Sequence, residues 1–243
     1  MAQLKGQEKA LYVNEMFGRI SAKYDLMNRL MTGGQDRRWR TFTVRLAMPG
    51  HGAKGLDVGT GTGDLAIELS KKCDQVVGVD TCLEMLDVGR QKLMEMHLDG
   101  RIKLMPGDAI SLPFEDNSFD AITTGFAMRN VIDIPKAFSE MQRVVRPGGR
   151  VACLETSMPQ NSIIRRLHHL YFEKMVPIIG WLVSGHRDAY SYLPNSTTYF
   201  PPAPQLKAIM ESAGLTNVRY YPLALGGVTV YVGTKLPTGK AAG

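Results

Sequence analysis

The sequence contains little cysteine, and its three cysteines lie far apart. Cys73, Cys82 and Cys153 form no C-x-x-C pair, and their odd number leaves one thiol over in any pairing. We therefore expect neither a disulfide framework nor a cysteine-based zinc site. Free thiols are typical of a reducing compartment, so the sequence predicts a cytoplasmic protein.

The sequence also lacks a long apolar run. Its first residues, MAQLKGQEKALYVNEMF, contain no apolar core of the length that a signal peptide requires. The most apolar stretch, MVPIIGWLV at 175–183, is interrupted by Pro177 and Gly180 and preceded by Glu173 and Lys174. It is shorter than the roughly 20 residues that a spanning helix needs. We expect a chain that does not cross a bilayer.

Apolar residues make up 44% of the 243 residues, which is enough for one domain with a full hydrophobic core. The formal net charge is +6 at pH 7. A basic balance of this size is compatible with a nucleic acid, an anionic membrane surface or an acidic cofactor as partner. Charge alone does not choose among the three.

From about Leu56 onward, short β-rich runs alternate with helical stretches. The run GLDVG leads into DLAIELSKK, and FDAITTGFAM leads into IPKAFSEMQRVV, after which RPGG turns into RVACLET. This alternation predicts crossover units, and hence an α/β fold with a parallel sheet covered on both faces. Near the end, VRYYPLAL and VTVYVGTK flank Gly226 and Gly227, a two-glycine hairpin signal. We therefore expect a mixed sheet whose last strand is antiparallel.

Two segments interrupt this alternation. Residues 8–46 have the pattern of basic helices joined by a turn at TGGQD, and in residues 159–200 the apolar positions from Ile163 to Met175 follow helical spacing. Both segments are expected to cover the carboxyl edge of the sheet, where doubly wound folds bind ligands. We divide the single domain, 1–243, into an N-terminal helical cap (1–46), a cofactor-binding core (47–158), a helical insert over the substrate site (159–200), and a C-terminal helix with a β-hairpin (201–236).

The stretch LDVGTGTGDLA places three glycines between a strand and a helix. Gly59, Gly61 and Gly63 let the backbone approach a ligand where a Cβ would collide. A dinucleotide fingerprint needs its third glycine at position 64, where Asp64 stands, so NAD is disfavoured. Asp80 ends the next strand, where an acidic residue can accept hydrogen bonds from ribose hydroxyls. A tight turn without any ligand is the alternative interpretation.

Four motifs follow one another along residues 53–155: LDVGTGTG, VVGVD, PGDAISLPFEDNSFDAI and RVVRPGGR. Together they resemble the successive motifs of class I S-adenosylmethionine-dependent methyltransferases. The resemblance implies a Rossmann-like doubly wound sheet of seven strands, with S-adenosylmethionine as co-substrate and without a metal. A sulfonium cofactor is cationic and carries no pyrophosphate, so acidic residues near the loop are tolerable. The resemblance also implies the cofactor residues: Thr62 with the glycine loop for the methionine end, Asp80 for the ribose, Asp108 and Ala109 for the adenine, and Asp57 and Gly125 beside them.

The flanking segments narrow the resemblance. They are MFGRISAKYDLMNRLMTGGQDRRWR at 16–40, GFAMRNVIDIPKAFSEMQRVVRPGG at 125–149, CLETSMPQ at 153–160 and YSYLPNSTTYFP at 190–201. They resemble the quinone C-methyltransferases of menaquinone and ubiquinone biosynthesis over nearly the whole chain, and LETS is more similar to the menaquinone branch. The resemblance implies methylation of a prenylated quinol, with demethylmenaquinol converted to menaquinol. The alternatives are a 2-methoxy-6-polyprenyl-1,4-benzoquinol or another small molecule.

Arg129, in TTGFAMRNVID, is the first candidate catalytic residue. Methylating a ring carbon requires that carbon to react as an enolate, so a ring hydroxyl must lose or share its proton. Arg129 stands just past the carboxyl end of a strand, and the resemblance implies a catalytic part for it. Because a guanidinium stays protonated, we predict that it polarises the quinol oxygen, directly or through a water. The alternative is an arginine that pairs with a helix acid and braces the loop.

Tyr24, in ISAKYDLMN, is the second candidate catalytic residue. The resemblance implies a lid tyrosine whose hydroxyl meets the quinol or the methionine end of the cofactor. Plain packing with Phe17, Ile20 and Met27, which follow helical spacing, is the alternative.

Several other polar residues near these candidates receive structural interpretations. Asp25 and Asn28 are interpreted as caps or braces, and Asn130 as a loop-fixing or helix-capping residue rather than a substrate contact. His168 and His169 point about 100° apart on a helix and cannot share one ion, so no metal site is predicted.

The insert also bears on partners. Its apolar residues can line a channel for a prenyl tail or rest on a membrane, with Arg165 and Arg166 facing anionic headgroups at the inner face. Ordinary cap packing is the alternative, and a homodimer is left open. Amino-methylating nucleic-acid enzymes carry an N/D-P-P-Y/F word where this chain has GFAMRN, so we expect no nucleic-acid partner.

Overall fold

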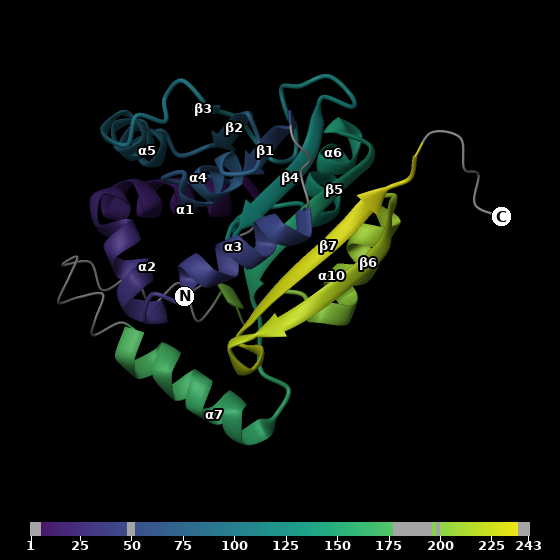
Figure 1. The fold of residues 1–243 in the computed structure, drawn as a ribbon. Helices are drawn as coiled ribbons and strands as arrows, with labels where there is room; N and C mark the ends of the chain where they lie inside the picture. Colours follow the sequence, from purple (N-terminus) through teal and green to yellow (C-terminus); the bar gives the residue numbers. More distant parts are fainter. Residues whose placement is uncertain (1–5, 48–51, 177–195, 198–199, 238–243) are drawn as a thin grey trace.

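The computed structural model describes residues 6–47, 52–176, 196, 197 and 200–237. These residues form a seven-stranded sheet in the order β3-β2-β1-β4-β5-β7-β6 (Figure 1). The parallel strands are β1 (Lys54–Val58), β2 (Gln75–Asp80), β3 (Ile102–Pro106), β4 (Phe119–Gly125) and β5 (Val145–Thr156). The last strand, β7 (Val228–Lys235), runs antiparallel to both β5 and β6 (Leu215–Leu223). The predicted mixed α/β sheet is confirmed.

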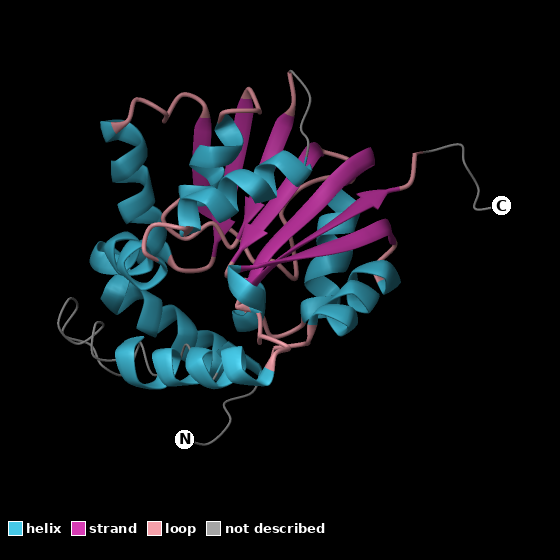
Figure 2. Cartoon of the chain, turned by 60° about the horizontal axis from the view of Figure 1, so that its bottom comes forward, coloured by secondary structure: helices cyan, strands magenta, loops and turns pink. Residues whose placement is uncertain are grey.

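Helices cover both faces of this sheet (Figure 2). On one face, α3 (Asp36–Ala47), α4 (Asp64–Ser70) and α5 (Leu83–Glu95) contribute to the clusters built around Leu69 and Ala121. On the other face, α6 (Ile134–Val144) and α10 (Ala203–Ser212) pack on alternate strand residues such as Leu56 and Ile122. Because strand side chains alternate between the faces, continuous apolar strands supply both cores.

Further helices of the described chain lie at the carboxyl edge of the sheet. The chain enters through α1 (Gly6–Ile20), the short helix η1 (Ser21–Lys23) and α2 (Tyr24–Thr32). The turn predicted at TGGQD follows, with positive φ at Gly33 and Gly34. In the insert, α7 (Ser162–Leu170) continues as a π-helical turn, η3 (Tyr171–Met175), and most of the remaining insert lies outside the described residues.

The C-terminal hairpin differs from its prediction. β6 ends at Leu223 and β7 begins at Val228, so four residues connect the strands rather than two glycines alone. Ala224 and Leu225 have positive φ together with Gly226, and this turn contains the short helix η4 (Ala224–Gly226). The predicted antiparallel pairing is confirmed, but the predicted length of the connection is wrong because non-glycine residues adopt left-handed backbone here.

RPGG, predicted as a turn before its strand, lies inside β5. The pairing of β5 with β4 passes from Phe119↔Val145 directly to Ala121↔Arg150, so the four residues form a bulge in a longer strand.

The strand order reverses direction between β1 and β4, since the chain leaves β1 toward β2 on one side and β4 toward β5 on the other. Loops therefore diverge at the carboxyl ends of these two strands, which is where doubly wound sheets form ligand crevices. None of the described helices combines the length and apolar character needed to cross a membrane.

Candidate functional site

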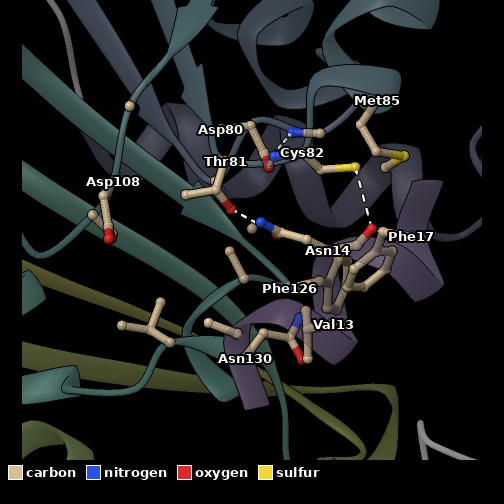
Figure 3. Close-up of a pocket in the computed structure, with 18 of the residues that line it drawn as sticks. Val13, Asn14, Phe17, Asp80, Thr81, Cys82, Met85, Asp108, Phe126 and Asn130 are labelled. Atoms are coloured by element: carbon tan, nitrogen blue, oxygen red, sulfur yellow. Dashed lines mark hydrogen bonds between the residues drawn. The ribbon is translucent and has the colours of Figure 1, made fainter. Parts of the chain in front are cut away.

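A cavity of about 250 Å³ lies at the carboxyl ends of β1, β2 and β4, beneath α1 (Figure 3). The side chain of Asn14 fixes α1 over it, since its Oδ1 accepts a hydrogen bond from the Thr81 hydroxyl at 2.8 Å. Loops that follow four different strands contribute to the lining. Six of the predicted cofactor residues are among the lining residues: Gly59, Gly61, Asp80, Asp108, Ala109 and Gly125.

Asp80 lies in this first cavity with its carboxylate held by the backbone. Its Oδ2 accepts from the Gly61 N–H at 2.7 Å, and its Oδ1 accepts from the Cys82 N–H at 2.9 Å. Burial raises the pKa of Asp80, and the backbone donors oppose that rise. Each oxygen can accept a second hydrogen bond. Asp80 therefore keeps the capacity to bind the two neighbouring hydroxyls of a ribose.

The charge of the first cavity has one sign. Its described lining includes two acids, Asp80 and Asp108, and no lysine or arginine. A pyrophosphate would face negative charge without a compensating cation, whereas a sulfonium would be attracted. The residues present thus fit S-adenosylmethionine and disfavour a dinucleotide.

The glycine loop is shaped by protein contacts as well as by the cavity. Gly59 and Gly61 both have positive φ, which side-chain-bearing residues rarely adopt. A Cβ at Gly59 would collide with Ala127, and one at Gly61 would lie 3.1 Å from the Met85 side chain. We expected these glycines to allow close approach of a ligand. The structure shows that they also allow close approach of Ala127 in the loop after β4 and of Met85 in α5.

Three predicted cofactor residues lie behind the cavity wall. Asp57 is fully buried and accepts hydrogen bonds from the hydroxyls of Thr60 at 2.7 Å and Thr123 at 2.8 Å. Thr62 donates its hydroxyl to Asp25 at 2.6 Å. Gly63 has a φ of +83° and occupies the N-cap position of α4. These residues hold the loop in place and are not among those that line the first cavity.

A second cavity, of about 270 Å³, adjoins the first and is mainly apolar. Met16, Ile20 and Met31 are among its lining residues. Three aromatic residues belong to the linings of both cavities: Phe17, Tyr24 and Phe126. Phe126 itself has a positive φ of 57°, immediately after the last residue of β4. The structure therefore places an acidic cavity and a more apolar cavity on either side of a common aromatic wall.

Arg129 lines the second cavity and is held in a buried ion pair. Its guanidinium lies 2.7 Å from Oε1 of Glu155 in β5, and its backbone N–H donates to Oε2 at 3.2 Å. The bracing contact left open for this arginine is thus present, with a strand carboxylate instead of a helix acid. Its Nε is nevertheless buried and has no hydrogen-bond partner among the described residues. One donor of this guanidinium is therefore left unsatisfied by the described residues.

Asn28 contributes a second donor of the same kind. It lines the second cavity, and its Nδ2 is buried without a hydrogen-bond partner among the described residues. Unpaired buried donors are costly, and an acceptor brought by a ligand satisfies them. Two such donors in an apolar cavity point to a ligand with an oxygen atom on an otherwise apolar body.

Tyr24 both packs in the core and reaches the cavities. Its ring meets Phe17 edge-on at 5.8 Å, in a cluster with Ile20 and Met27, so the predicted packing is present. Burial raises the pKa of Tyr24, and the positive charge of Arg129 opposes that rise. Tyr24 therefore remains a neutral hydroxyl near neutral pH, able to donate a hydrogen bond.

A charged network, defined here as Asp25, Asp36, Arg40, Asp64 and Lys92, fixes the helix that carries Tyr24. Lys92 of α5 lies 2.7 Å from Asp25 of α2 and 2.7 Å from Asp64 of α4. Arg40 of α3 pairs with Asp36 and lies 3.4 Å from Asp64. The brace predicted for Asp25 is confirmed. The sequence could not indicate the network, because its members come from four helices far apart in the chain.

The structure changes the interpretation of two other polar residues. Asn130 does not cap α6, since Asp133 does so by accepting from the Lys136 N–H at 2.9 Å. Instead Asn130 lines the first cavity, with its Oδ1 buried and unpartnered among the described residues (Figure 3). His168 lines the second cavity while His169 is exposed, so the two rings point in different directions, as predicted.

Solved structures with similar folds have low sequence identity to this chain. The cyclase SpnF matches with a TM-score of 0.69 at 18% identity, over 94% of this chain and 97% of that chain. An S-adenosylmethionine-dependent methyltransferase from Thermotoga maritima matches with a TM-score of 0.66 at 20% identity, over 92% and 99% of the two chains. Fold and cavity together define the class as the Rossmann-like methyltransferase fold, which hosts more than one chemistry.

Curated relatives are much more similar in sequence. The demethylmenaquinone methyltransferase of Roseiflexus castenholzii is 46% identical over 230 residues, covering 94% of this chain and 95% of the relative. The ubiquinone/menaquinone biosynthesis C-methyltransferase UbiE of Geotalea daltonii is 41% identical over 231 residues, covering 94% and 98%. The family model described as the ubiE/COQ5 methyltransferase family matches residues 2–235. The chain belongs to this family, which confirms the resemblance found in its motifs.

Asp57 generates a prediction about pH. Burial raises its pKa from 3.8 to about 7, so between these values the folded protein holds a proton that the unfolded chain has lost. Stability contributed by this group therefore falls as the pH rises from about 4 to 7. We expect Asp57→Asn, which stays neutral, to make the unfolding free energy fall less steeply, by up to about 1.4 kcal/mol per pH unit. Urea denaturation across this range measures it, and parallel profiles for the two proteins would contradict it.

Lys92 generates a prediction about the charged network. Lys92→Met leaves Asp25 and Asp64 without their shared cation, so we expect the unfolding free energy to fall by about 2 kcal/mol. Affinity for S-adenosylmethionine should fall severalfold, since Asp25 also holds Thr62 of the glycine loop. Calorimetry and urea denaturation measure the two effects.

The matched control is Lys207→Met on α10, whose Nζ lies 3.7 Å from the exposed Glu211. It should change stability by less than about 0.5 kcal/mol. Equal losses of unfolding free energy in Lys92→Met and Lys207→Met would refute a stabilising role for the charged network.

Proposed function

We propose that this protein transfers the methyl group of S-adenosylmethionine to a ring carbon of a prenylated quinol, with demethylmenaquinol as substrate. The observation that carries the proposal is the pair of cavities that share Tyr24. One contains two acids and no lysine or arginine in its described lining, and the other is more apolar and has two residues with unpartnered donors in its lining. Membership of the family supports methyl transfer. The names of the curated relatives supply the class of substrate.

The first cavity is proposed to hold the cofactor. Asp80 binds the ribose hydroxyls, and Asp108 and Ala109 receive the adenine. Gly59, Gly61 and Gly125 line the same cavity, in the direction of the methionine end. When bound, S-adenosylmethionine supplies an activated methyl group on a positively charged sulfur. Asp57, Thr62 and Gly63 do not line this cavity and contribute by fixing the conformation of the glycine loop.

The second cavity is proposed to hold the quinol ring. Loss of the hydroxyl proton places negative charge on a ring oxygen, and donors that are already in place stabilise this anion. Arg129 Nε and Asn28 Nδ2 are such donors, since the protein gives them no partner among the described residues. A guanidinium favours loss of the hydroxyl proton by stabilising the resulting anion, and it does not itself accept the proton. The charge leaves the oxygen as the ring carbon attacks the methyl group, after which that carbon loses its hydrogen as a proton and the oxygen regains one. The proton released overall passes to solvent.

Tyr24 is proposed to align the two reactants. Its side chain belongs to both linings, so its hydroxyl can donate to the quinol oxygen or to the methionine carboxylate without changing helix position. The charged network holds α2 and thereby the tyrosine. Correct placement of carbon against methyl is worth several kcal/mol of barrier, because the cofactor needs no other activation.

Product analysis tests the reaction and the substrate together. The protein is incubated anaerobically with S-adenosylmethionine and either demethylmenaquinol or 2-methoxy-6-polyprenyl-1,4-benzoquinol, and the product is identified by mass spectrometry. We expect one methyl group on a ring carbon of the naphthoquinol. The oxidised quinone should give no product, because it has no hydroxyl proton to lose. Methylation of the benzoquinol alone, or of neither quinol, would refute the proposed substrate.

Arg129→Lys tests the role of the arginine while keeping a cation opposite Glu155. We expect a folded protein with unchanged affinity for S-adenosylmethionine and a kcat about 100-fold lower or more, the usual loss for one oxyanion donor. A cation is kept because removing it would leave Glu155 charged and buried, which is strongly destabilising.

The control for this variant is Arg146→Lys, in which a surface arginine 2.8 Å from Asp120 is changed in the same way. It should keep the original kcat. A folded Arg129→Lys enzyme with unchanged turnover would show that the arginine only braces its loop.

A further inference from the structure

Helix α7 carries apolar or aromatic residues on two adjoining sides. His168 and, just beyond the helix, Tyr171 line the apolar cavity, and the Tyr171 hydroxyl donates to the Met31 carbonyl at 2.7 Å. On the adjoining side, three residues at spacing i, i+4 and i+7 are exposed by 71%, 62% and 55% respectively: Ile163, Leu167 and Leu170. No residue of α7 is buried. The helix is therefore a thin wall, with the cavity on one side and an apolar stripe facing outward.

Other exposed leucines lie on the elements that meet α7. Leu225, in the hairpin turn, is 77% exposed and lies two residues before Gly227, whose Cα approaches the His168 ring so closely that a Cβ would lie 3.1 Å from it. Leu26 and Leu30 are about half exposed on α2, the helix whose Met31 accepts the Tyr171 bond. Figures 1 and 2 both show α7 at the margin of the molecule, away from the sheet. Exposed leucines are thus present on both elements that contact α7 or its extension η3.

The charges beside this surface are mainly positive. Residues 162–175 contain Arg165, Arg166 and Lys174 against the single acid Glu173. Arg165 fixes the start of the helix by donating to the carbonyls of Pro159 at 2.9 Å and Gln160 at 3.1 Å. Arg166 and Lys174 are exposed. An exposed apolar stripe bordered by cations is the pattern of helices that lie in the interface of anionic membranes.

The size of the apolar cavity supports the same partner. At about 270 Å³ it lies below the roughly 300–1,000 Å³ that encloses a drug-sized ligand, so it suits a ring and the first part of a tail. The rest of a long prenyl chain must lie outside the cavity. The exposed leucines of α7 belong to the helix whose His168 lines this cavity.

We infer that α7, together with Leu225 and the exposed leucines of α2, docks on the surface of an anionic bilayer, from which the prenyl tail enters the apolar cavity sideways. The partner is a bilayer because the stripe combines apolar exposure with cations and adjoins a cavity suited to a lipid headgroup. The entry of a prenyl tail rests on the proposed function, whereas the docking of α7 on a bilayer does not.

Vesicle binding tests the docking face. Wild type and the double variant Leu167→Glu/Leu170→Glu are sedimented with vesicles of phosphatidylcholine alone or of equal parts phosphatidylcholine and phosphatidylglycerol. We expect wild type to prefer the anionic vesicles and to be released by salt. The affinity of the double variant for these vesicles should be lower by about tenfold or more. The control is Met94→Glu on α5, a residue 57% exposed outside this surface, which should bind like wild type. Failure of wild type to bind, or wild-type binding by the double variant, overturns the inference.

Turnover separates this inference from the proposed function. Each protein is assayed with long-tailed demethylmenaquinol in anionic vesicles and with a dispersed analogue that lacks the tail. We expect the double variant to lose about tenfold or more of its turnover with the vesicle substrate and to keep its turnover with the tail-less one. Equal losses with both substrates would overturn sideways entry. Absence of methylation by wild type with either quinol would refute the proposed function, and the sedimentation result would still decide the docking.

Discussion

The buried carboxylate of Glu155 is the contact on which the wall between the two cavities depends. It accepts from the Arg129 guanidinium at 2.7 Å and from the Thr156 N–H at 2.8 Å, and its side chain is fully buried. A buried charge is stable only when it is paired and hydrogen-bonded, so the end of β5 and the loop after β4 are held together. The same pair fixes the guanidinium while leaving its Nε without a partner in the described chain. Bracing and catalysis are therefore compatible in one arginine.

A second set of charges joins the helices around the site. Lys92 and Arg40 join the helices of the N-terminal cap to α4 and α5, whereas the side chains nearer the cavities are mainly apolar. The cap is thus anchored by charge and shaped inside by aromatic rings.

Much of this arrangement could be predicted from the sequence, and the rest depends on contacts between distant segments. Alternating strands and helices predicted the sheet, and the glycine loop with Asp80 predicted residues that the fold brings to one cavity. The place of Asn130 in the first cavity could not be predicted from its local sequence, because that cavity wall is completed by α1. No local signal in CLETSMPQ indicates a role for Glu155, because its partner Arg129 lies in the loop after another strand. The hairpin turn failed as a prediction because three successive residues adopt positive φ, and two of them are not glycine.

The aromatic wall of Phe17, Tyr24 and Phe126 makes the two binding equilibria interdependent. In the proposed complex, an occupant of either cavity contacts side chains that also line the other cavity, so neither affinity is a property of one cavity alone. Thermodynamic reciprocity then requires equal factors: whatever the bound nucleoside does to the affinity for the lipid, the lipid does to the affinity for the nucleoside. In the proposed reaction, two products occupy the cavities after methyl transfer. The departure of one product then changes the affinity of the protein for the other.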